Sequence, residues 1–169
     1  VSDPPGEALY VRDLETGELW TPTPLPIRED GTYLVRHGQG YSRFERVTRG
    51  LAHDLLVFVP TDDPVRIARL RIENRGPRAR RLSVTAYVEW VLGVSRASGA
   101  PYLITEIDPE TGAILARNPW NADFPDRVAF LDMAGMQQGR TADRTEFLGR
   151  NGAQGRPAAL RGDRALSGR

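Results

Sequence analysis

Apolar and polar residues alternate most regularly over residues 66–92. In residues 82–92 (LSVTAYVEWVL) the even positions are apolar, and most of the odd positions are polar. A period of two places successive side chains on opposite faces of a β-strand. Residues 66–73 alternate in the same way, and Asn74-Arg75-Gly76-Pro77 between the two runs is typical of a turn. The pattern predicts two long antiparallel strands joined by a short basic loop, with Trp90 on the face that builds the core.

Shorter runs at fairly regular spacing predict further strands. They cover residues 8–14, 32–36, 41–49, 51–59, 102–107, 113–116 and 127–132. Gly38-Gln39-Gly40 predicts a kink or bulge, and residues 143–149 fit one more strand. The segment 51–59 is apolar at both parities towards its end, which is typical of a strand covered on both sides. No segment shows the 3.6-residue period of a long helix.

This succession of strands predicts an all-β fold, a large antiparallel β-sandwich rather than a small barrel. We expect the sandwich to occupy residues 1–138. Residues 139–169 form an irregular tail that packs on something else, because Gly, Arg and Ala dominate there without periodicity. Val1 is not an initiator Met, and the end at Arg169 resembles neither a helix nor a strand terminus. We therefore expect the chain to be a segment of a longer protein.

Composition excludes several classes of function. The net charge of +1 gives no electrostatic reason to expect nucleic acid or direct membrane contact. The chain has no Cys and two His, so we expect no metal site and no cofactor. No apolar run approaches the roughly 20 residues that span a bilayer. The arginines within residues 75–81 suit either a phosphate or acidic partner, or simply a solvated loop.

Carboxylates are present, but none stands in a recognisable catalytic pair. Glycoside cleavage needs an acid placed over the glycosidic oxygen. Asp108 lies in a turn signature, which favours a capping role. Asp123 and Asp126 lie in a Pro-flanked loop, where local hydrogen bonding is the simpler interpretation. We expect no catalytic residue in this chain.

Aromatic and polar residues in two regions are candidates for sugar contact. Trp120 and Phe124 lie in a loop, where an aromatic face can stack on the C–H face of a pyranose ring, or cover the edge of the sandwich instead. His37 and Tyr41 flank the Gly-rich segment at residues 38–40. They either face a sugar or serve the packing of their strands.

Three stretches resemble a known family. They are YLVRHGQGYSRFERVTRGL at 33–51, TGAILARNPWNADFPDRVAF at 111–130 and TADRTEFLGRNGAQGRPAAL at 141–160. Together they resemble the amino-terminal β-sandwich domain of the glycoside phosphorylases once called glycosyltransferase family 36, which includes cellobiose and chitobiose phosphorylases. The resemblance is greatest to the phosphorylase-like, carboxy-terminal region of cyclic β-1,2-glucan synthases.

The resemblance implies a specific architecture. In such proteins this domain is a supersandwich like that of galactose mutarotase, followed by a helical linker and an (α/α)6 barrel that carries the general acid and the phosphate site. In the glucan synthases a membrane-bound glycosyltransferase region comes first, and catalysis is cytoplasmic. The resemblance therefore implies a cytoplasmic domain of a bacterial protein anchored in the inner membrane. The sequence stops at Arg169 and the barrel is absent, so the family's catalytic acid has no counterpart here.

The resulting prediction is a noncatalytic domain of a carbohydrate-active transferase. It supports the catalytic barrel, shapes a β-glucan groove and, by the resemblance, contributes a dimer contact. The most family-typical stretch supplies the expected barrel interface: Arg144, Glu146, Phe147, Arg150 and Asn151. The alternatives are a freestanding carbohydrate-binding module, and an epimerase or lyase of the mutarotase-like type.

Overall fold

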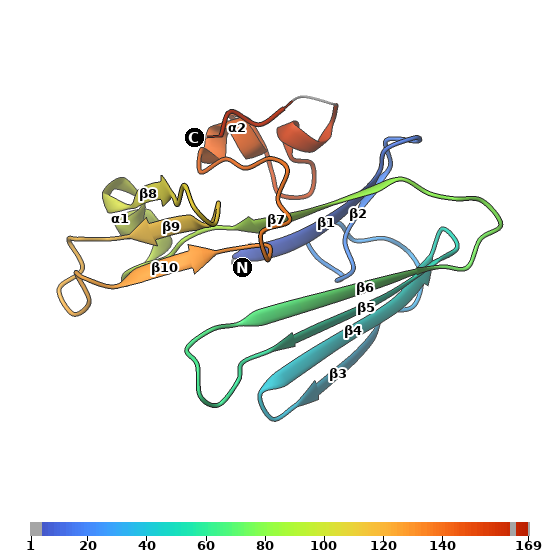
Figure 1. Ribbon diagram of the computed structural model, residues 1–169, viewed down its shortest axis with the longest axis horizontal. Coiled ribbons are helices and arrows are strands. Elements are labelled where there is room, and N and C mark those ends of the chain that lie inside the picture. Colours follow the sequence, from blue (N-terminus) through green and yellow to red (C-terminus); the bar gives the residue numbers. More distant parts are fainter. Residues whose placement is uncertain (1–4, 163–164, 169) are drawn as a thin grey trace. The chain divides into compact units, whose positions relative to one another are not determined.

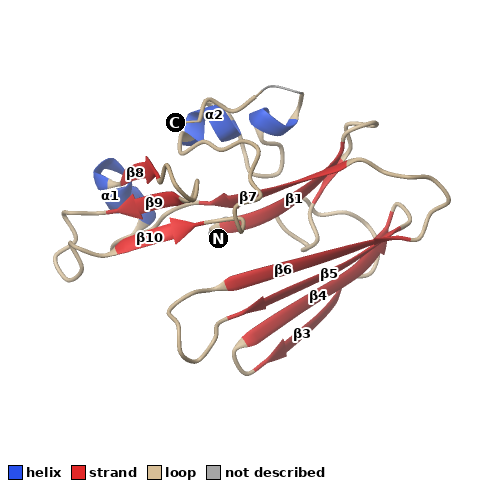
Figure 2. Cartoon of the chain, in the orientation of Figure 1, coloured by secondary structure: helices blue, strands red, loops and turns tan. Residues whose placement is uncertain are grey.

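Antiparallel β-structure dominates the chain. A computed structural model describes residues 5–162 and 165–168, and its strands form three sheets with the orders β2-β1-β7, β3-β4-β5-β6 and β10-β9-β8 (Figures 1 and 2). The chain divides into two compact units, one formed by residues 8–85 and the other by residues 1–7 and 86–169.

The strands are short to medium in length, and the helices are single turns. The strands are β1 Glu7–Asp13, β2 Leu19–Trp20, β3 Leu34–Gly38, β4 Tyr41–Thr48, β5 Leu51–Phe58, β6 Ile67–Asn74, β7 Leu82–Val88, β8 Ile104–Ile107, β9 Ile114–Arg117 and β10 Val128–Leu131. The helices are α1 Arg96–Gly99 and α2 Arg144–Leu148, with 3-10 turns η1 Ala100–Tyr102 and η2 Ala158–Leu160.

The sheet β3-β4-β5-β6 is a meander held by tight turns. Thr48 pairs with Leu51, so Arg49 and Gly50 form a two-residue hairpin loop. Both loop residues have positive φ, 54° and 73° respectively. Two positive φ angles define the hairpin turn whose twist matches that of the strands, and Gly adopts this conformation without steric cost.

The core of the unit formed by residues 8–85 is small and contains the indole of Trp20. Val11, Trp20 and Leu51 are fully buried, and the partly buried Leu70 and Ile72 of β6 pack against them. The expected inward face of β6 is therefore confirmed at Leu70 and Ile72, whereas Ala68 at the same parity is exposed.

The other unit is built around the sheet β10-β9-β8 and the helix α2. Residues 108–112 form the predicted turn between β8 and β9, where Ile107 pairs with Ile114. The ring of Tyr87 stacks on Phe147 of α2, with ring centroids 5.1 Å apart and an interplanar angle of 12°. This stack holds the helix on the unit because both rings are buried.

The predicted long hairpin over residues 66–92 is wrong. β6 pairs with β5, whereas β7 lies beside β1 in a different sheet. Alternation shows that a strand has two unlike faces, but it does not specify the neighbouring strand. The connecting loop is organised by Asn74, which donates to the carbonyl of Arg78 at 2.7 Å and accepts from the amide of Gly76 at 3.0 Å.

The inward face of residues 82–92 also differs from the prediction. Trp90 lies beyond β7 and is only half-buried, and Val84 is exposed. Tyr87, at an odd position, is the buried residue instead, because it packs on Phe147.

Two smaller predictions are corrected in the same way. Residues 38–40 are not a kink, since Gly38 pairs with Tyr41 across a two-residue turn. Residues 144–148 are helical rather than extended. Asp143 caps this helix by accepting from the amides of Thr145 and Glu146 at 2.7 and 3.1 Å, which is the usual role of Asp at a helix N-terminus.

The burial of β5 also differs from the prediction. Its buried positions are Leu51, His53 and Leu55, and the residues towards its end are half-buried. The strand therefore has one buried face along its first half, rather than cover on both sides.

Candidate functional site

A pocket of about 470 Å³ opens in the unit formed by residues 1–7 and 86–169. Residues 91–94 form part of its wall, and the loop between β9 and β10 together with the first half of β10 forms the remainder. Its apolar lining includes Val91, Val94, Phe124 and Val128, all of which are exposed. A pocket of this size is in the range of small-molecule sites.

Two asparagines give the loop between β9 and β10 its shape. Asn118 is 5% exposed, and its amide donates to the carbonyl of Leu92 at 2.6 Å. The amide of Asn121 donates to the same carbonyl at 3.4 Å. Their side-chain oxygens accept from backbone amides two residues on, in Trp120 and Asp123. These contacts fold the loop by Asx turns and fasten it to the preceding segment.

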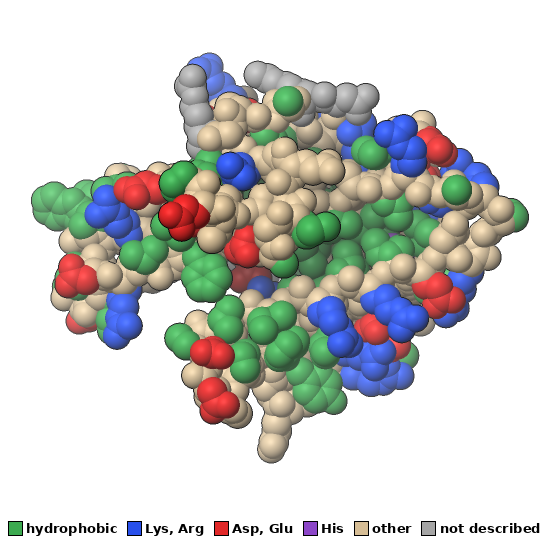
Figure 3. Space-filling view, in the orientation of Figure 1, with side chains coloured by type: hydrophobic (Ala, Val, Ile, Leu, Met, Phe, Trp, Pro, Cys, Tyr) green, Lys and Arg blue, Asp and Glu red, His purple; other side chains and the backbone are tan. Residues whose placement is uncertain are grey.

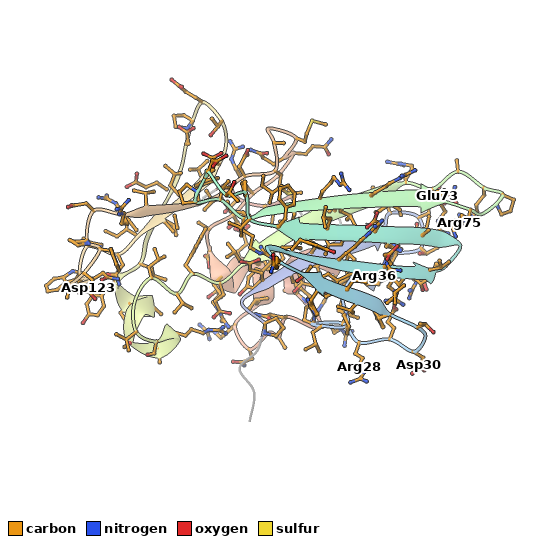
Figure 4. The ribbon with its side chains drawn as sticks, turned by 90° about the horizontal axis from the view of Figure 1, so that it is seen from below. Arg28, Asp30, Arg36, Glu73, Arg75 and Asp123 are labelled. Atoms are coloured by element: carbon orange, nitrogen blue, oxygen red, sulfur yellow. The ribbon has the colours of Figure 1, made fainter. Side chains whose placement is uncertain are left out.

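The other polar residues that line the pocket keep their hydrogen-bonding capacity. In the part of the chain that the structure describes, the side chains of Asp123 and Arg127 make no hydrogen bond or ion pair. The predicted local role of Asp123 is therefore wrong, because Asn121 supplies the local hydrogen bonds of the loop. Figure 4 marks Asp123. Asp108 does take the predicted turn role, because its carboxylate accepts from the hydroxyl of Thr111 and from the amide of Thr111 at 3.0 Å. The hydrogen bond from the hydroxyl, and secondly that from the amide, lower the pKa of Asp108.

The aromatic candidates in this loop are exposed. Trp120 is 77% exposed and Phe124 is 61% exposed. The indole of Trp120 lies against the ring of Tyr102, with centroids 5.6 Å apart and a tilt of 37°. Neither aromatic closes over a buried core, so both can contact a ligand.

His37 and Tyr41 lie in the unit formed by residues 8–85. Nδ1 of His37 is 2.9 Å from the hydroxyl of Ser42, and its ring meets Phe44 edge-on at 6.3 Å. Tyr41 is 45% exposed, and its ring covers the position where a side chain on Gly38 would lie.

The five residues of the predicted barrel interface differ in burial. Phe147 is buried against Tyr87, and Glu146 accepts from the amide and hydroxyl of Ser167 at 2.8 and 2.6 Å. Arg144 pairs with Glu89 at 3.3 Å and remains largely exposed. Arg150 and Asn151, which follow the helix, are exposed; in the part of the chain that the structure describes, their side chains make no hydrogen bond or ion pair.

Glu89 has a structural role that the sequence pattern did not indicate. Its carboxylate accepts from the hydroxyl of Tyr87 at 3.2 Å, from the side-chain amide of Gln154 at 3.3 Å, and from Arg96 and Arg144. The same Gln154 amide donates to the carbonyl of Pro5 at 2.7 Å. Glu89 therefore ties together segments far apart in the sequence. The alternation placed Glu89 at the parity opposite Trp90 and gave no sign of this role.

A shallow groove of about 600 Å³ lies on the unit formed by residues 8–85. Charges of both signs line it, and Figure 3 shows arginines and carboxylates side by side towards the end of β6, where Figure 4 marks Glu73 and Arg75. Arg43 donates two hydrogen bonds to Asp54, at 2.8 and 2.7 Å. This contact lowers the pKa of Asp54. The carboxylate and guanidinium are therefore already paired, which limits what they offer a ligand.

The same unit contains a buried cluster around Trp20. Nε1 of the indole donates to Nε2 of His53 at 2.9 Å. Arg46 is 5% exposed, pairs with Glu29 at 3.0 Å, and lies over the ring of Tyr33 at 4.2 Å. Burial, and secondly the positive charge of Arg46, lower the pKa of His53 to about 4. A His held neutral in this way serves the core, where it orients Trp20.

Within residues 5–162 and 165–168 no three His, Cys, Asp or Glu side chains converge as metal ligands would. None of the helices in this part of the chain has the length and apolar character needed to cross a bilayer.

Fold and pockets together define a mostly β, antiparallel domain that displays aromatic and polar side chains on an exposed loop. Residues 1–169 match the family model for the supersandwich domain of glycosyl hydrolase 94, and the chain belongs to that family. This confirms the predicted fold class and the resemblance to glycoside phosphorylases.

Curated relatives support the same assignment. The chain is 40% identical over 165 residues to the cyclic beta-(1,2)-glucan synthase NdvB of Rhizobium meliloti. This match covers 97% of the chain and 6% of the relative. It is 33% identical to the solabiose phosphorylase of Paenibacillus borealis, over 89% of the chain and 20% of the relative. It is 35% identical to the N,N'-diacetylchitobiose phosphorylase of Vibrio furnissii, over 52% of the chain and 11% of the relative. The chain thus spans a small part of the length of each relative.

Proposed function

We propose that the chain is a noncatalytic supersandwich domain of a glycoside phosphorylase or cyclic β-1,2-glucan synthase. In this role it supports the catalytic (α/α)6 barrel and shapes the groove that holds a β-glucan. The observation that carries the proposal is the coverage: the whole chain matches one family domain, yet it spans 6% and 20% of the length of two relatives. Those relatives therefore contain much more chain than this domain.

The end of α2 is the proposed contact with the barrel. Phe147 and Leu148 are buried and anchor the helix to this unit. Arg150 and Asn151 follow directly and are exposed. An anchored helix followed by exposed polar residues suits a contact with a neighbouring domain, because the contacting side chains are not needed for folding of the unit itself. Residues 1–138 would then be the sandwich, and residues 139–169 would lead towards the barrel.

The exposed aromatic residues are the proposed contacts with sugar. Trp120 and Phe124 offer ring faces on which pyranose C–H groups can stack, and Tyr102 braces the indole. His37 and Tyr41 are further candidates on the other unit. The longer protein would be anchored in the inner membrane of a bacterium, with this domain on the cytoplasmic side and with a dimer contact.

A stability comparison tests the proposed barrel contact. Arg150→Ala and Asn151→Ala together should leave the Tm of the 169-residue chain unchanged, because both side chains are exposed. In the longer protein the same pair should lower the Tm of the barrel and the rate of phosphorolysis. Arg28→Ala is the matched control, since Arg28 is exposed and lies in the other unit (Figure 4). Unchanged Tm and unchanged phosphorolysis in the longer protein would refute the contact.

The second candidate is a freestanding carbohydrate-binding module. The pocket beside Phe124 favours it, because a binding module needs a ligand site of its own. In that case the 169-residue chain would bind a β-glucan by itself, and loss of Trp120 would weaken this binding.

A further inference from the structure

The pocket lined by Asp123, Phe124 and Arg127 combines three chemical properties in one place. Phe124, Val91 and Val128 supply apolar surface. Asp123 is a hydrogen-bond acceptor, and Arg127 is a planar donor with five N–H groups. The loop that carries Asp123 is fixed by the hydrogen bonds of Asn118 and Asn121, so the pocket is preformed.

These properties select a class of ligand. One carboxylate and one guanidinium leave the pair of polar groups with no net charge, so they do not favour an anion or a cation. A pyranose ring has an apolar C–H face and a rim of hydroxyls that both donate and accept. It can place its face on Phe124 while its hydroxyls hydrogen-bond to Asp123 and Arg127. Because such bonds involve charged groups, they are stronger than bonds between neutral groups.

We propose that this pocket is a glycan subsite that binds one glucose unit of a β-linked glucan, with Asp123 and Arg127 as its hydrogen-bonding residues. The identity of the sugar rests on the proposed function, whereas the site itself rests on the pocket and on the side chains of Asp123 and Arg127, which are unpaired among residues 5–162 and 165–168. Asp123 is chosen over Asp126 because Asp123 lines the pocket, and Asp126 is exposed on the same loop but is not part of the lining.

The test is an NMR titration of the ¹⁵N-labelled 169-residue chain with a β-1,2-linked glucotriose. Saturable shifts should appear in the amides of residues 91–94 and 121–129. Asp123→Ala and Arg127→Ala should each weaken binding about tenfold or more, as expected for loss of a charge-assisted hydrogen bond. Asp126→Ala is the matched control and should bind as the unaltered chain does. A fingerprint spectrum of each variant verifies that it is folded.

Three results would overturn the subsite. They are no saturable shift at the highest soluble sugar concentration, shifts confined to other residues, or binding that Asp123→Ala and Arg127→Ala leave unchanged. None of them bears on the contact at Arg150 and Asn151, which is measured by the stability of the longer protein. Failure of the subsite is therefore distinguishable from failure of the proposed support role.

Discussion

His53 should make the stability of the chain depend on pH between about pH 6.5 and 4. Its side chain is 3% exposed, and its pKa falls from 6.5 to about 4 in the folded chain. In the folded chain Nε2 accepts from Trp20, so the neutral ring carries its proton on Nδ1. Protonation of Nε2 would remove this acceptor and place a positive charge beside Arg46.

The sign and size of this pH dependence of stability follow from proton linkage. The unfolded chain binds a proton at His53 more readily than the folded chain does, so stability is fully present above about pH 6.5 and declines as the pH falls towards 4. Each pH unit in this window costs up to about 1.4 kcal/mol. Lowering the pH from 7.5 to 5 should therefore cost up to about 2 kcal/mol, or about thirtyfold in the unfolding equilibrium.

Urea unfolding at pH 7.5 and pH 5 measures this change, and His53→Gln is the matched variant. Gln does not titrate, and its side-chain oxygen can still accept from Trp20. The loss of stability between the two pH values should be smaller in the variant by most of the predicted 2 kcal/mol. Glu29 does not contribute to the difference between pH 7.5 and pH 5. Its hydrogen bond from Arg49 lowers its pKa below the ordinary 4.5, so its contribution to stability is lost only in stronger acid. Equal pH dependence in both proteins would show that His53 is not its source.

Three further substitutions should lower the free energy of unfolding, each for a different reason. Arg80→Ala should cost about 3 kcal/mol, because it removes the nearer of two arginines that pair with the fully buried carboxylate of Asp13 and leaves only Arg78, at 3.8 Å. Phe147→Ala should cost about 3–5 kcal/mol by removing a buried ring that stacks on Tyr87. Gly50→Ala should cost about 1 kcal/mol, because its φ of 73° disfavours a side chain. Urea unfolding measures all three.

Each of these substitutions has a control of the same chemical type. Arg75→Ala removes an exposed pair with Glu73 and should cost less than about 1 kcal/mol. Phe130→Ala removes a ring that is 53% exposed, so it should lower the free energy of unfolding less than Phe147→Ala does. Gly99→Ala adds a methyl group to a helix at a point where no atom from elsewhere in the described part of the chain lies within 4 Å, and it should not destabilise. Costs that do not differ between a substitution and its control would contradict the assigned cause.

The strands were predictable where alternation and turn chemistry agree. The turn at residues 108–112 is confirmed because Asp108, Thr111 and a Gly of positive φ define it locally. The sheet assignment of β6 and β7 was not predictable in this way. β6 pairs with β5, the strand just before it, whereas β7 lies beside β1, which is distant in sequence. Alternation carries no information about which strand is the partner.

Helix α2 illustrates a local signal that was present and missed. Asp143 followed three residues later by Glu146 has the spacing of an N-terminal capping box, and the helix begins there. Glu89 had no such signal, because its importance comes from Arg144 and Gln154, which the fold brings to it. Asp123 was interpretable only once Asn121 was seen to supply the local hydrogen bonds.

The central claim is that this domain supports glycan chemistry without performing it. The most direct test is to incubate a β-1,2-linked gluco-oligosaccharide and inorganic phosphate with the 169-residue chain, and separately with the longer protein, and to measure the sugar 1-phosphate that phosphorolysis releases. We expect release by the longer protein and none by the chain. Release of sugar phosphate by the chain alone would contradict it.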